Sequence, residues 1–173
     1  MLKIISHFSQ LDFSQLMNVY EQSNSENARM RNSNMTENER YLRHIEGFYT
    51  YLRESFFRSP DCVYAVWAPQ ERYVSALRLE PYRDGLLLEA LETAPQERGK
   101  GYATALLRAL ADYLCTTQWD TVYSHVGKKN RSSLAVHAAC GFERILEHAV
   151  FVDGSVSHNS CTLRLHIKQE GTE

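Results

Sequence analysis

The segment from Thr93 to Thr104 constrains the fold more than any other part of the chain, because its glycines form a turn between an expected strand and an expected helix. The strand is predicted at Leu86 to Thr93. The helix is predicted over 102–114, where apolar residues recur on one face, and a buried strand is predicted over 121–126. A strand, a crossover helix and a second strand form a βαβ unit, whose two strands run parallel. The sequence therefore predicts helices packed on a sheet.

Further elements are predicted on both sides of this unit from caps, turns and hydrophobic period. Before it, we expect a strand at 2–8, a helix from Asp12 to about Gln22, a loop or frayed helix end in the polar segment 23–40, a helix from the Thr36–Glu39 capping box to about Arg58, and a hairpin of strands at 62–68 and 73–80. After it, we expect a short helix that Asn130 caps and Gly141 ends, then a closing hairpin of 142–152 with 161–167.

The composition fits a single domain over residues 1–173. The chain has a net charge of −2 and 43% hydrophobic residues, and a chain of about 150 residues buries roughly two-thirds of its unfolded surface. It can therefore build a full core. The slightly acidic balance provides no basic field for a phosphate backbone, so we expect no nucleic-acid partner.

Neither a membrane segment nor a metal site is predicted. The longest unbroken apolar run, Cys62 to Ala68, has seven residues, whereas a membrane-spanning helix needs about 20. The first residues turn polar too early for a secretory signal. The four cysteines stand far apart, with no spacing typical of zinc ligands. We expect a cytoplasmic protein with reduced cysteines and no membrane partner.

Residues 98–104 favour an anion at the start of the predicted helix. The first amides of a helix have no partner within the helix, and the helix dipole is positive there. Gly99 and Gly101 let a ligand approach the backbone, while Arg98 and Lys100 add positive charge. A phosphate group is the ligand that such a turn suits.

Two common phosphate-binding loops do not fit. A Walker A loop would need glycine where Ala94 stands. A dinucleotide-binding loop would need glycine or alanine where Thr104 stands, and it usually follows the first strand of its domain.

The same segment resembles the acetyl-CoA loop of the GNAT superfamily of N-acetyltransferases. The loop pattern is Arg98-x-x-Gly101-x-Ala103, preceded by Pro95 and followed by an amphipathic helix. A second stretch resembles the family's next strand-to-helix segment, with Asn130, Leu134, His137 and Gly141-Phe142 in that order. The resemblance covers 86–142 and implies a single-domain α/β (α+β) fold, in which a mixed, mostly antiparallel central sheet carries helices on both faces.

The resemblance implies acetyl-CoA as co-substrate, bound where the strand at 86–93 splays from its parallel partner at 121–126. Backbone groups of Leu91 and Thr93 are expected at the thioester, and Asn130 at the pantetheine. The pyrophosphate is expected at the loop and helix start, which comprise Arg98, Gly99, Lys100, Gly101, Tyr102, Ala103 and Thr104.

The implied reaction is attack of a neutral amine on the thioester, which needs a base for the amine proton and an acid for the thiolate. As acid, His137 stands where the family usually has tyrosine, and the simpler interpretation is that it packs in its helix. As base, we expect Glu89, with Glu92 second. Tyr123 and His125 lie on the neighbouring strand.

Strand geometry bears on the choice between the two glutamates. Alternation puts Glu89 on the side of Leu91 and Thr93, and Glu92 on the opposite side, unless a bulge resets the phase. The simpler interpretation for each is a charge on a solvated strand face.

The acceptor is expected to contact residues 20–58 and 150–158, which show no recognisable pattern. A small amine, an amino acid, an aminoglycoside and a protein amine all stay open. The alternative is a non-catalytic acyl-CoA-binding regulatory or interaction module, in which His137 marks loss of the usual acid. The sequence also allows a homodimer.

Overall fold

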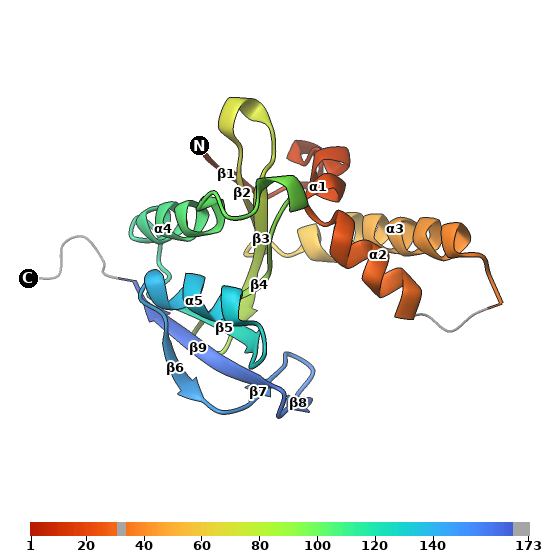
Figure 1. Cartoon of the computed structure of the whole chain (residues 1–173). Helices are drawn as coiled ribbons and strands as arrows, with labels where there is room; N and C mark the ends of the chain where they lie inside the picture. Colours follow the sequence, from red (N-terminus) through yellow and green to blue (C-terminus); the bar gives the residue numbers. More distant parts are fainter. Residues whose placement is uncertain (31–33, 168–173) are drawn as a thin grey trace, which may run out of the picture.

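The computed structural model describes residues 1–30 and 34–167 (Figure 1). Positions 31–33, which include Asn32 of the predicted polar segment, and positions 168–173 lie outside this description. In chain order the elements are β1 (Leu2–Ile5), α1 (Phe13–Val19), α2 (Glu21–Met30), α3 (Glu37–Glu54), β2 (Val63–Trp67), β3 (Ser75–Tyr82), β4 (Gly85–Thr93), α4 (Tyr102–Leu114), β5 (Thr121–Gly127), α5 (Arg131–Ala139), β6 (Glu143–Leu146), β7 (Ala149–Val150), β8 (Val156–Ser157) and β9 (Ser160–His166).

The central sheet has seven strands in the order β1-β2-β3-β4-β5-β9-β6. β4 and β5 run parallel, and every other neighbouring pair in this sheet is antiparallel. The predicted mixed, mostly antiparallel sheet is confirmed, and so is the βαβ unit around α4. None of the helices in the described part of the chain combines the length and hydropathy that a bilayer crossing requires.

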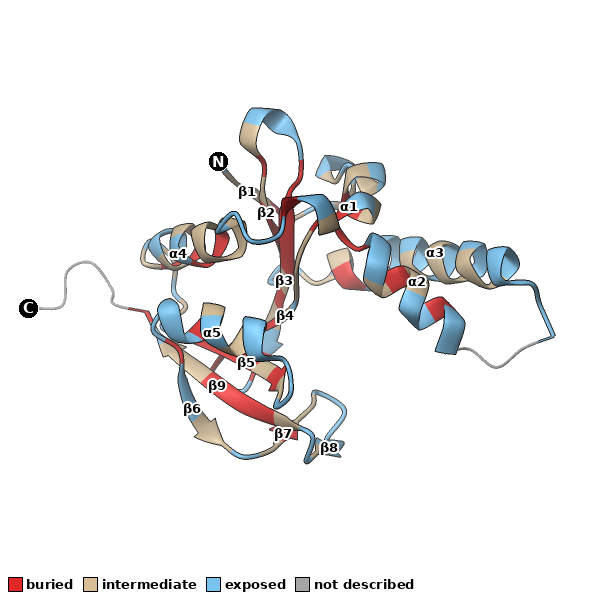
Figure 2. Ribbon diagram, in the orientation of Figure 1, coloured by how far each residue is buried: buried red, intermediate tan, exposed pale blue. Residues whose placement is uncertain are grey.

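Helices cover both faces of the sheet. The amphipathic face of α4 packs on one side, with Leu106, Leu107, Leu110 and Leu114 all buried. The opposite side is covered by α1 and α3, whose Leu16, Val19 and Leu52 join a second buried cluster. Buried residues concentrate on the central strands between these layers (Figure 2).

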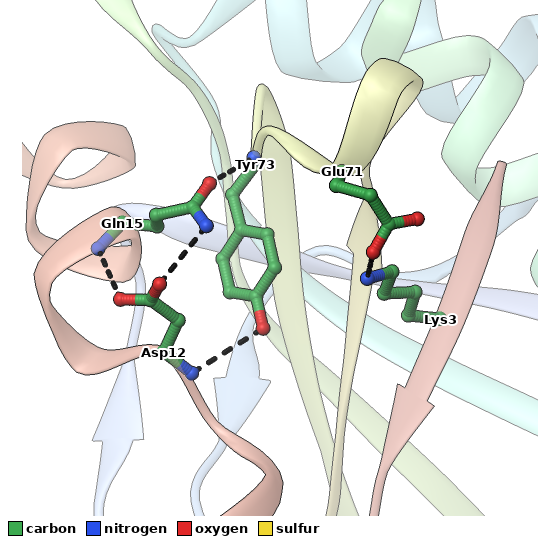
Figure 3. A network of polar contacts seen from close by, with 5 residues as sticks. All are labelled: Lys3, Asp12, Gln15, Glu71 and Tyr73. Atoms are coloured by element: carbon green, nitrogen blue, oxygen red, sulfur yellow. Dashed lines mark hydrogen bonds and ion pairs between the residues drawn. The ribbon is translucent and has the colours of Figure 1, made fainter.

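A polar network fixes α1 against the loop between β2 and β3 (Figure 3). Asp12 caps α1, because its Oδ1 accepts from the Gln15 amide at 3.1 Å. The Gln15 Oε1 in turn accepts from the Tyr73 amide at 2.8 Å, and the Asp12 amide donates to the Tyr73 hydroxyl at 3.3 Å. Lys3 and Glu71 form an ion pair beside it. The predicted cap of the first helix is confirmed.

The prediction of a loop or frayed end over 23–40 is wrong for its first part, which forms helix α2. This helix is stabilised by a buried polar contact to α3 in place of an apolar face. Asn24 is only 5% exposed, and its Oδ1 accepts from the His44 Nε2 at 3.2 Å. The Thr36–Glu39 capping box at the start of α3 is confirmed, with both reciprocal hydrogen bonds formed.

The predicted closing hairpin forms only in part. β6 pairs with β9, but the chain then leaves the sheet and β7 pairs with β8 in a separate two-stranded sheet. The Thr162 hydroxyl donates to the His148 carbonyl at 2.7 Å, so the side chain of β9 satisfies backbone that a continuing strand would have paired. The first strand is likewise shorter than predicted, because a 3₁₀ turn at Phe8–Gln10 follows Ile5.

Candidate active site

The parallel strands β4 and β5 separate where the chain approaches the glycine turn. They pair only from Leu86 with Val122 to Leu88 with Ser124. Among the described residues, no strand pairs with the edge of β4 that faces β5 beyond Leu88. The backbone groups along the separated edges of β4 and β5 can therefore bind an extended ligand, as they would bind an added strand.

A β-bulge in β4 decides which way the two glutamates point. Ala76 lies opposite Glu92 and Arg78 opposite Glu89, so two residues of β4 face one residue of β3. Ala90 sits in this bulge with a φ of +52°, which is unusual for a residue other than glycine. The bulge resets the alternation.

Glu89 and Glu92 consequently face the same side of the sheet, the one covered by α1 to α3. Glu89 contacts Arg78, whose guanidinium lies over the ring of Tyr51 in α3. Glu92 lies opposite Ala76, which belongs to the buried cluster under α1 and α3. Leu91 packs instead into the core under α4. Simple alternation, which put Glu89 with Leu91 and Glu92 opposite, is wrong here because of the bulge.

A cleft of about 690 Å³ opens between the diverging strands. Its walls come from α2, the end of β4, the glycine turn, the end of β5 and the start of α5. They comprise Gln22, Ser23, Glu26, Leu88, Glu89, Ala90, Leu91, Glu92, Thr93, Arg98, Gly99, Ala103, Ser124, His125, Val126, Gly127, Asn130, Ser132, Ser133, Val136 and His137.

Most of the residues predicted for the site meet in this cleft. Its walls include Glu89, Glu92, His137, Leu91, Thr93, Arg98, Gly99, Ala103 and Asn130. Lys100, Gly101, Tyr102 and Thr104 belong to the same turn and helix start but do not line the cleft wall.

The glycine turn presents backbone to one end of the cleft. Gly99 and Gly101 have φ values of +75° and +79°, and a Cβ at either position would meet nothing within 4 Å. Gly101 is the residue that precedes the first turn of α4. The amides of the first helical turn are therefore exposed to a ligand at the positive end of the helix dipole.

Ion pairs fix the charged residues of this turn. The Glu97 side chain is 9% exposed and lies 2.5 Å from Arg72 Nη2 and 2.8 Å from Lys100 Nζ. Hydrogen bonds from Lys100 and Arg72 lower the pKa of Glu97. Arg98 donates through Nε to the Thr93 carbonyl at 3.2 Å and through Nη1 to Gln22 Oε1 at 2.6 Å. The turn is thus tied both to the β2–β3 loop and to α2.

Glu89 belongs to a half-buried charged group on the face of the sheet covered by α1 to α3. Its Oε2 accepts from Arg78 Nε at 3.0 Å and from Arg78 Nη2 at 2.8 Å. Burial, together with a hydrogen bond to Glu89, raises the pKa of Glu80 to about 6. These contacts fix the position of the Glu89 carboxylate.

Glu92 lies in a less charged setting. Burial raises the pKa of Glu92, against the opposing effect of a hydrogen bond from Ser23. A carboxylate whose pKa is raised is a better proton acceptor near neutral pH than an ordinary one.

Helix α5 is built by the pattern Asn130 to Phe142. The Asn130 Oδ1 accepts from the Ser133 amide at 3.1 Å and caps the helix, as predicted. Gly141 has a φ of +85°, its amide donates to the Ala138 carbonyl, and the Phe142 amide donates to the His137 carbonyl. This is the Schellman arrangement, in which the residue after glycine packs back on the last turn.

His137 makes that packing contact. Its ring lies edge to face with Phe142 at 4.9 Å, and the side chain is 1% exposed. Nδ1 donates to the Ser133 carbonyl at 2.8 Å, while Nε2 is buried with no hydrogen-bond partner among the described residues. Burial lowers the pKa of His137. The role of His137 as acid stays a prediction.

Three cleft residues from α2 had no signal in the sequence. Gln22, Ser23 and Glu26 line the cleft, although their segment has the composition of a loop. The capping box that follows was recognisable, but the contact that brings α2 to β4 is a tertiary one.

The comparisons with known proteins agree with this geometry. The model of the acetyltransferase (GNAT) family matches residues 27–142. No curated protein sequence gave a significant match. Among solved structures, similar folds include the ribosomal-protein-S18-alanine N-acetyltransferase from Escherichia coli, with 17% identity over 99% of this chain and 97% of that one and a TM-score of 0.62.

Two further structures share the fold. The PaiA N-acetyltransferase from Thermoplasma acidophilum, solved in complex with coenzyme A, has 12% identity over 96% of this chain and 99% of that one, with a TM-score of 0.66. A variant of spermidine N-acetyltransferase SpeG from Vibrio cholerae has 18% identity over 96% and 94%, with a TM-score of 0.58. Because the family match runs from within α2 to the end of α5, and so takes in both strands that diverge at the cleft, this chain belongs to the acetyltransferase (GNAT) family and is an acyltransferase.

Proposed function

We propose that the protein transfers the acetyl group of acetyl-CoA to a primary amine by direct attack. The observation that carries the proposal is the single cleft in which the free edges of β4 and β5 meet the glycine turn before α4. An extended arm that ends in a pyrophosphate needs both features in line.

In this proposal the coenzyme lies along the cleft with its two ends recognised separately. The amides of 98–104 and the Arg98 guanidinium bind the pyrophosphate, with Lys100 held beside them by Glu97. Backbone groups of Leu91 and Thr93 bind near the thioester, and Asn130 contacts the pantetheine. The hydrogen bond from Arg98 to Gln22 extends the site to α2.

The acceptor amine enters from the side covered by α2 and α3, where Glu89 and Glu92 meet the cleft. Its nitrogen lone pair forms the new C–N bond to the acetyl carbon, the C–S bond breaks, and the electron pair leaves on sulfur. Glu89 and Glu92 are the carboxylates proposed to handle the amine proton, and His137 is proposed to protonate the thiolate.

The acceptor is tested with a panel of amines. Solved relatives of the same fold include enzymes named for a ribosomal protein and for spermidine. We would incubate the protein and acetyl-CoA with spermidine, an aminoglycoside, free amino acids and a peptide with N-terminal alanine. Acetylated product, detected by mass, supports the proposal.

The second candidate is a non-catalytic acyl-CoA-binding module. The burial of His137 favours it, since a buried neutral imidazole is not a ready acid. Binding of acetyl-CoA without turnover of any amine, together with a stable complex with another protein, would favour the module.

The four free cysteines of the described chain support the predicted reducing, cytoplasmic location.

A further inference from the structure

His125 lies on the β5 wall of the cleft, between two aromatic side chains. Its ring is held edge to face by Tyr82 at 5.5 Å and by Phe151 at 5.3 Å. Both ring nitrogens are buried, and neither has a hydrogen-bond partner within residues 1–30 and 34–167. A buried polar atom without a partner is costly, so its retention points to a partner supplied by a ligand.

His125 lies at the point where the two strands part. β4 and β5 pair up to Leu88 with Ser124, so Glu89 and His125 are the first residues beyond the last pair. The charge of Glu89 acts on the imidazole across this opening. The acetyl group is proposed to lie here, because the arm of the coenzyme enters between the same two strands.

Burial favours a neutral His125 ring at rest, and the nearby charge of Glu89 supports a proton when it arrives. Burial lowers the pKa of His125, and Arg83 of the β3–β4 turn acts in the same direction. Glu89 opposes both. The other groups packed on the ring are the aromatic side chains of Tyr82 and Phe151. A neutral imidazole is the form that can accept a proton.

We propose that His125 accepts the proton of the attacking amine and that Glu89 stabilises the resulting imidazolium. The inference rests on the proposed acetyl transfer and refines its base. The amine lone pair forms the C–N bond, the C–S bond breaks with its electrons on sulfur, and the N–H proton passes to an imidazole nitrogen. The imidazolium then releases this proton to water, and the thiolate takes up one proton, so the reaction balances.

The two cleft histidines differ in their freedom to do this. His137 Nδ1 donates to the Ser133 carbonyl, so turning its ring breaks a hydrogen bond. Turning the His125 ring breaks no hydrogen bond among the described residues, and His125 lines the cleft wall, so in our proposal such a turn presents a ring nitrogen to the cleft. Glu89 is less suited to accept the proton itself, because Arg78 donates two hydrogen bonds to its Oε2. Its fixed charge is suited to stabilising a cation.

The test is chemical rescue. His125→Ala should lower kcat by about 10²-fold or more with an acetyl-CoA Kd within about threefold of wild type. Free imidazole should restore part of the rate, and 4-methylimidazole should restore it in proportion to its basicity. The matched control is His166→Ala, which removes an exposed imidazole from the far end of β9 and should change neither rate nor rescue.

A second variant keeps the test decisive if His125→Ala does not fold. Since His125 acts when neutral, the rate rises with pH through its pKa, and Glu89→Gln removes the charge that raises this pKa. The acidic limb should therefore move to lower pH. Loss of that limb in Glu89→Gln would make Glu89 the base and overturn the inference.

Failure of the inference and failure of the proposed function give different results. Wild-type protein that acetylates an amine, with His125→Ala equally active and its acidic limb unmoved, overturns only the role of His125. Wild-type protein that acetylates no amine in the panel overturns both proposals.

Discussion

The Tyr20 hydroxyl donates a 2.8 Å hydrogen bond to the carbonyl of Ala90, and so joins the end of α1 to the bulge of β4. Tyr20 is only 3% exposed, and burial raises its pKa well above the ordinary value. It therefore stays a neutral donor. Ala90 holds a left-handed φ of +52° that an alanine adopts only at a cost. This one contact helps to keep both cleft glutamates on the same face.

Tyr20→Phe should weaken the bulge while leaving the core volume almost unchanged. We expect a loss of about 1 kcal/mol in the free energy of unfolding, because the Ala90 carbonyl loses its donor. The acceptor KM should rise more than the acetyl-CoA Kd. The companion variant Ala90→Gly relieves the left-handed strain and should stabilise the protein by about 1 kcal/mol. Urea unfolding measures both, and a stabilised Tyr20→Phe would contradict the assignment.

Acetyl-CoA should stabilise the fold. At about 100 times its Kd, a ligand that binds only the native state adds ~2.7 kcal/mol, which for a chain of this length raises Tm by roughly 5 to 11 °C. Thermal unfolding with and without millimolar acetyl-CoA measures the shift. NADH and ATP serve as controls and should raise Tm less, because the turn lacks their loop patterns. An unchanged Tm with acetyl-CoA would count against the cleft as its site.

Gly101→Ala should lower coenzyme affinity at least about tenfold, which is ~1.4 kcal/mol. A Cβ there enters open space in front of the first turn of α4, where the pyrophosphate is proposed to bind. Gly154→Ala is the matched control, because Gly154 has a similar φ of +82° and an equally open Cβ position on the β7–β8 turn. Both should lose similar stability, but calorimetry should find weaker acetyl-CoA binding in Gly101→Ala alone.

Glu97→Gln should alter the pH dependence of stability. The folded pKa of Glu97 is lowered by Lys100 and Arg72, so its stabilising effect is present above the unfolded pKa and is lost as pH falls through the folded one. The variant should be less stable than wild type at about pH 7, and the two should converge at about pH 3. The exposed Glu71 is the control, since Glu71→Gln removes a surface ion pair and should show little effect. Equal differences at both pH values would refute the role given to the Glu97 charge.

His137→Phe separates proton donation from packing. Because burial lowers the pKa of His137 below about 6.5, its imidazolium is a minor form at neutral pH. Any catalytic donation should therefore appear in acid: kcat should fall at least about tenfold at about pH 5.5 and hardly change at about pH 8. His137→Tyr, which restores the residue usual in the family, should retain activity. An equal loss at both pH values would assign His137 to packing on Phe142.

Local patterns were enough to predict the part of the molecule that runs from the glycine turn to the end of α5. Helix α4 follows from apolar spacing that places Leu106 and Leu110 in the core, and α5 follows from Asn130 and Gly141 at its ends. Each of these signals lies within a few residues of the element it specifies. The glycine turn, the crossover helix and the capped helix could therefore be predicted from the sequence, without knowledge of the tertiary structure.

The N-terminal helices and the bulge of β4 depended on contacts between distant positions. Helix α2 is stabilised by Asn24 and His44, which are 20 positions apart, and the bulge at Ala90 is bonded to Tyr20, 70 positions away. No residue next to Ala90 in the sequence indicates a left-handed backbone conformation, since neither neighbour is glycine. Simple alternation therefore placed Glu89 wrongly on the face of Leu91, and the polar composition of α2 wrongly predicted a loop.

The divergence of β4 from β5 also makes the sheet mechanically discontinuous. Within the described residues, β1–β4 and the second part of the sheet, formed by β5, β9 and β6, are paired by three residue pairs between β4 and β5. An extended acyl donor bound between the free edges of β4 and β5 would act as a missing strand and stiffen the whole sheet. Amide exchange in β4 and β5 would then slow together as the donor concentration rises, so that the rigidity of the sheet itself reports how much acyl donor surrounds the protein.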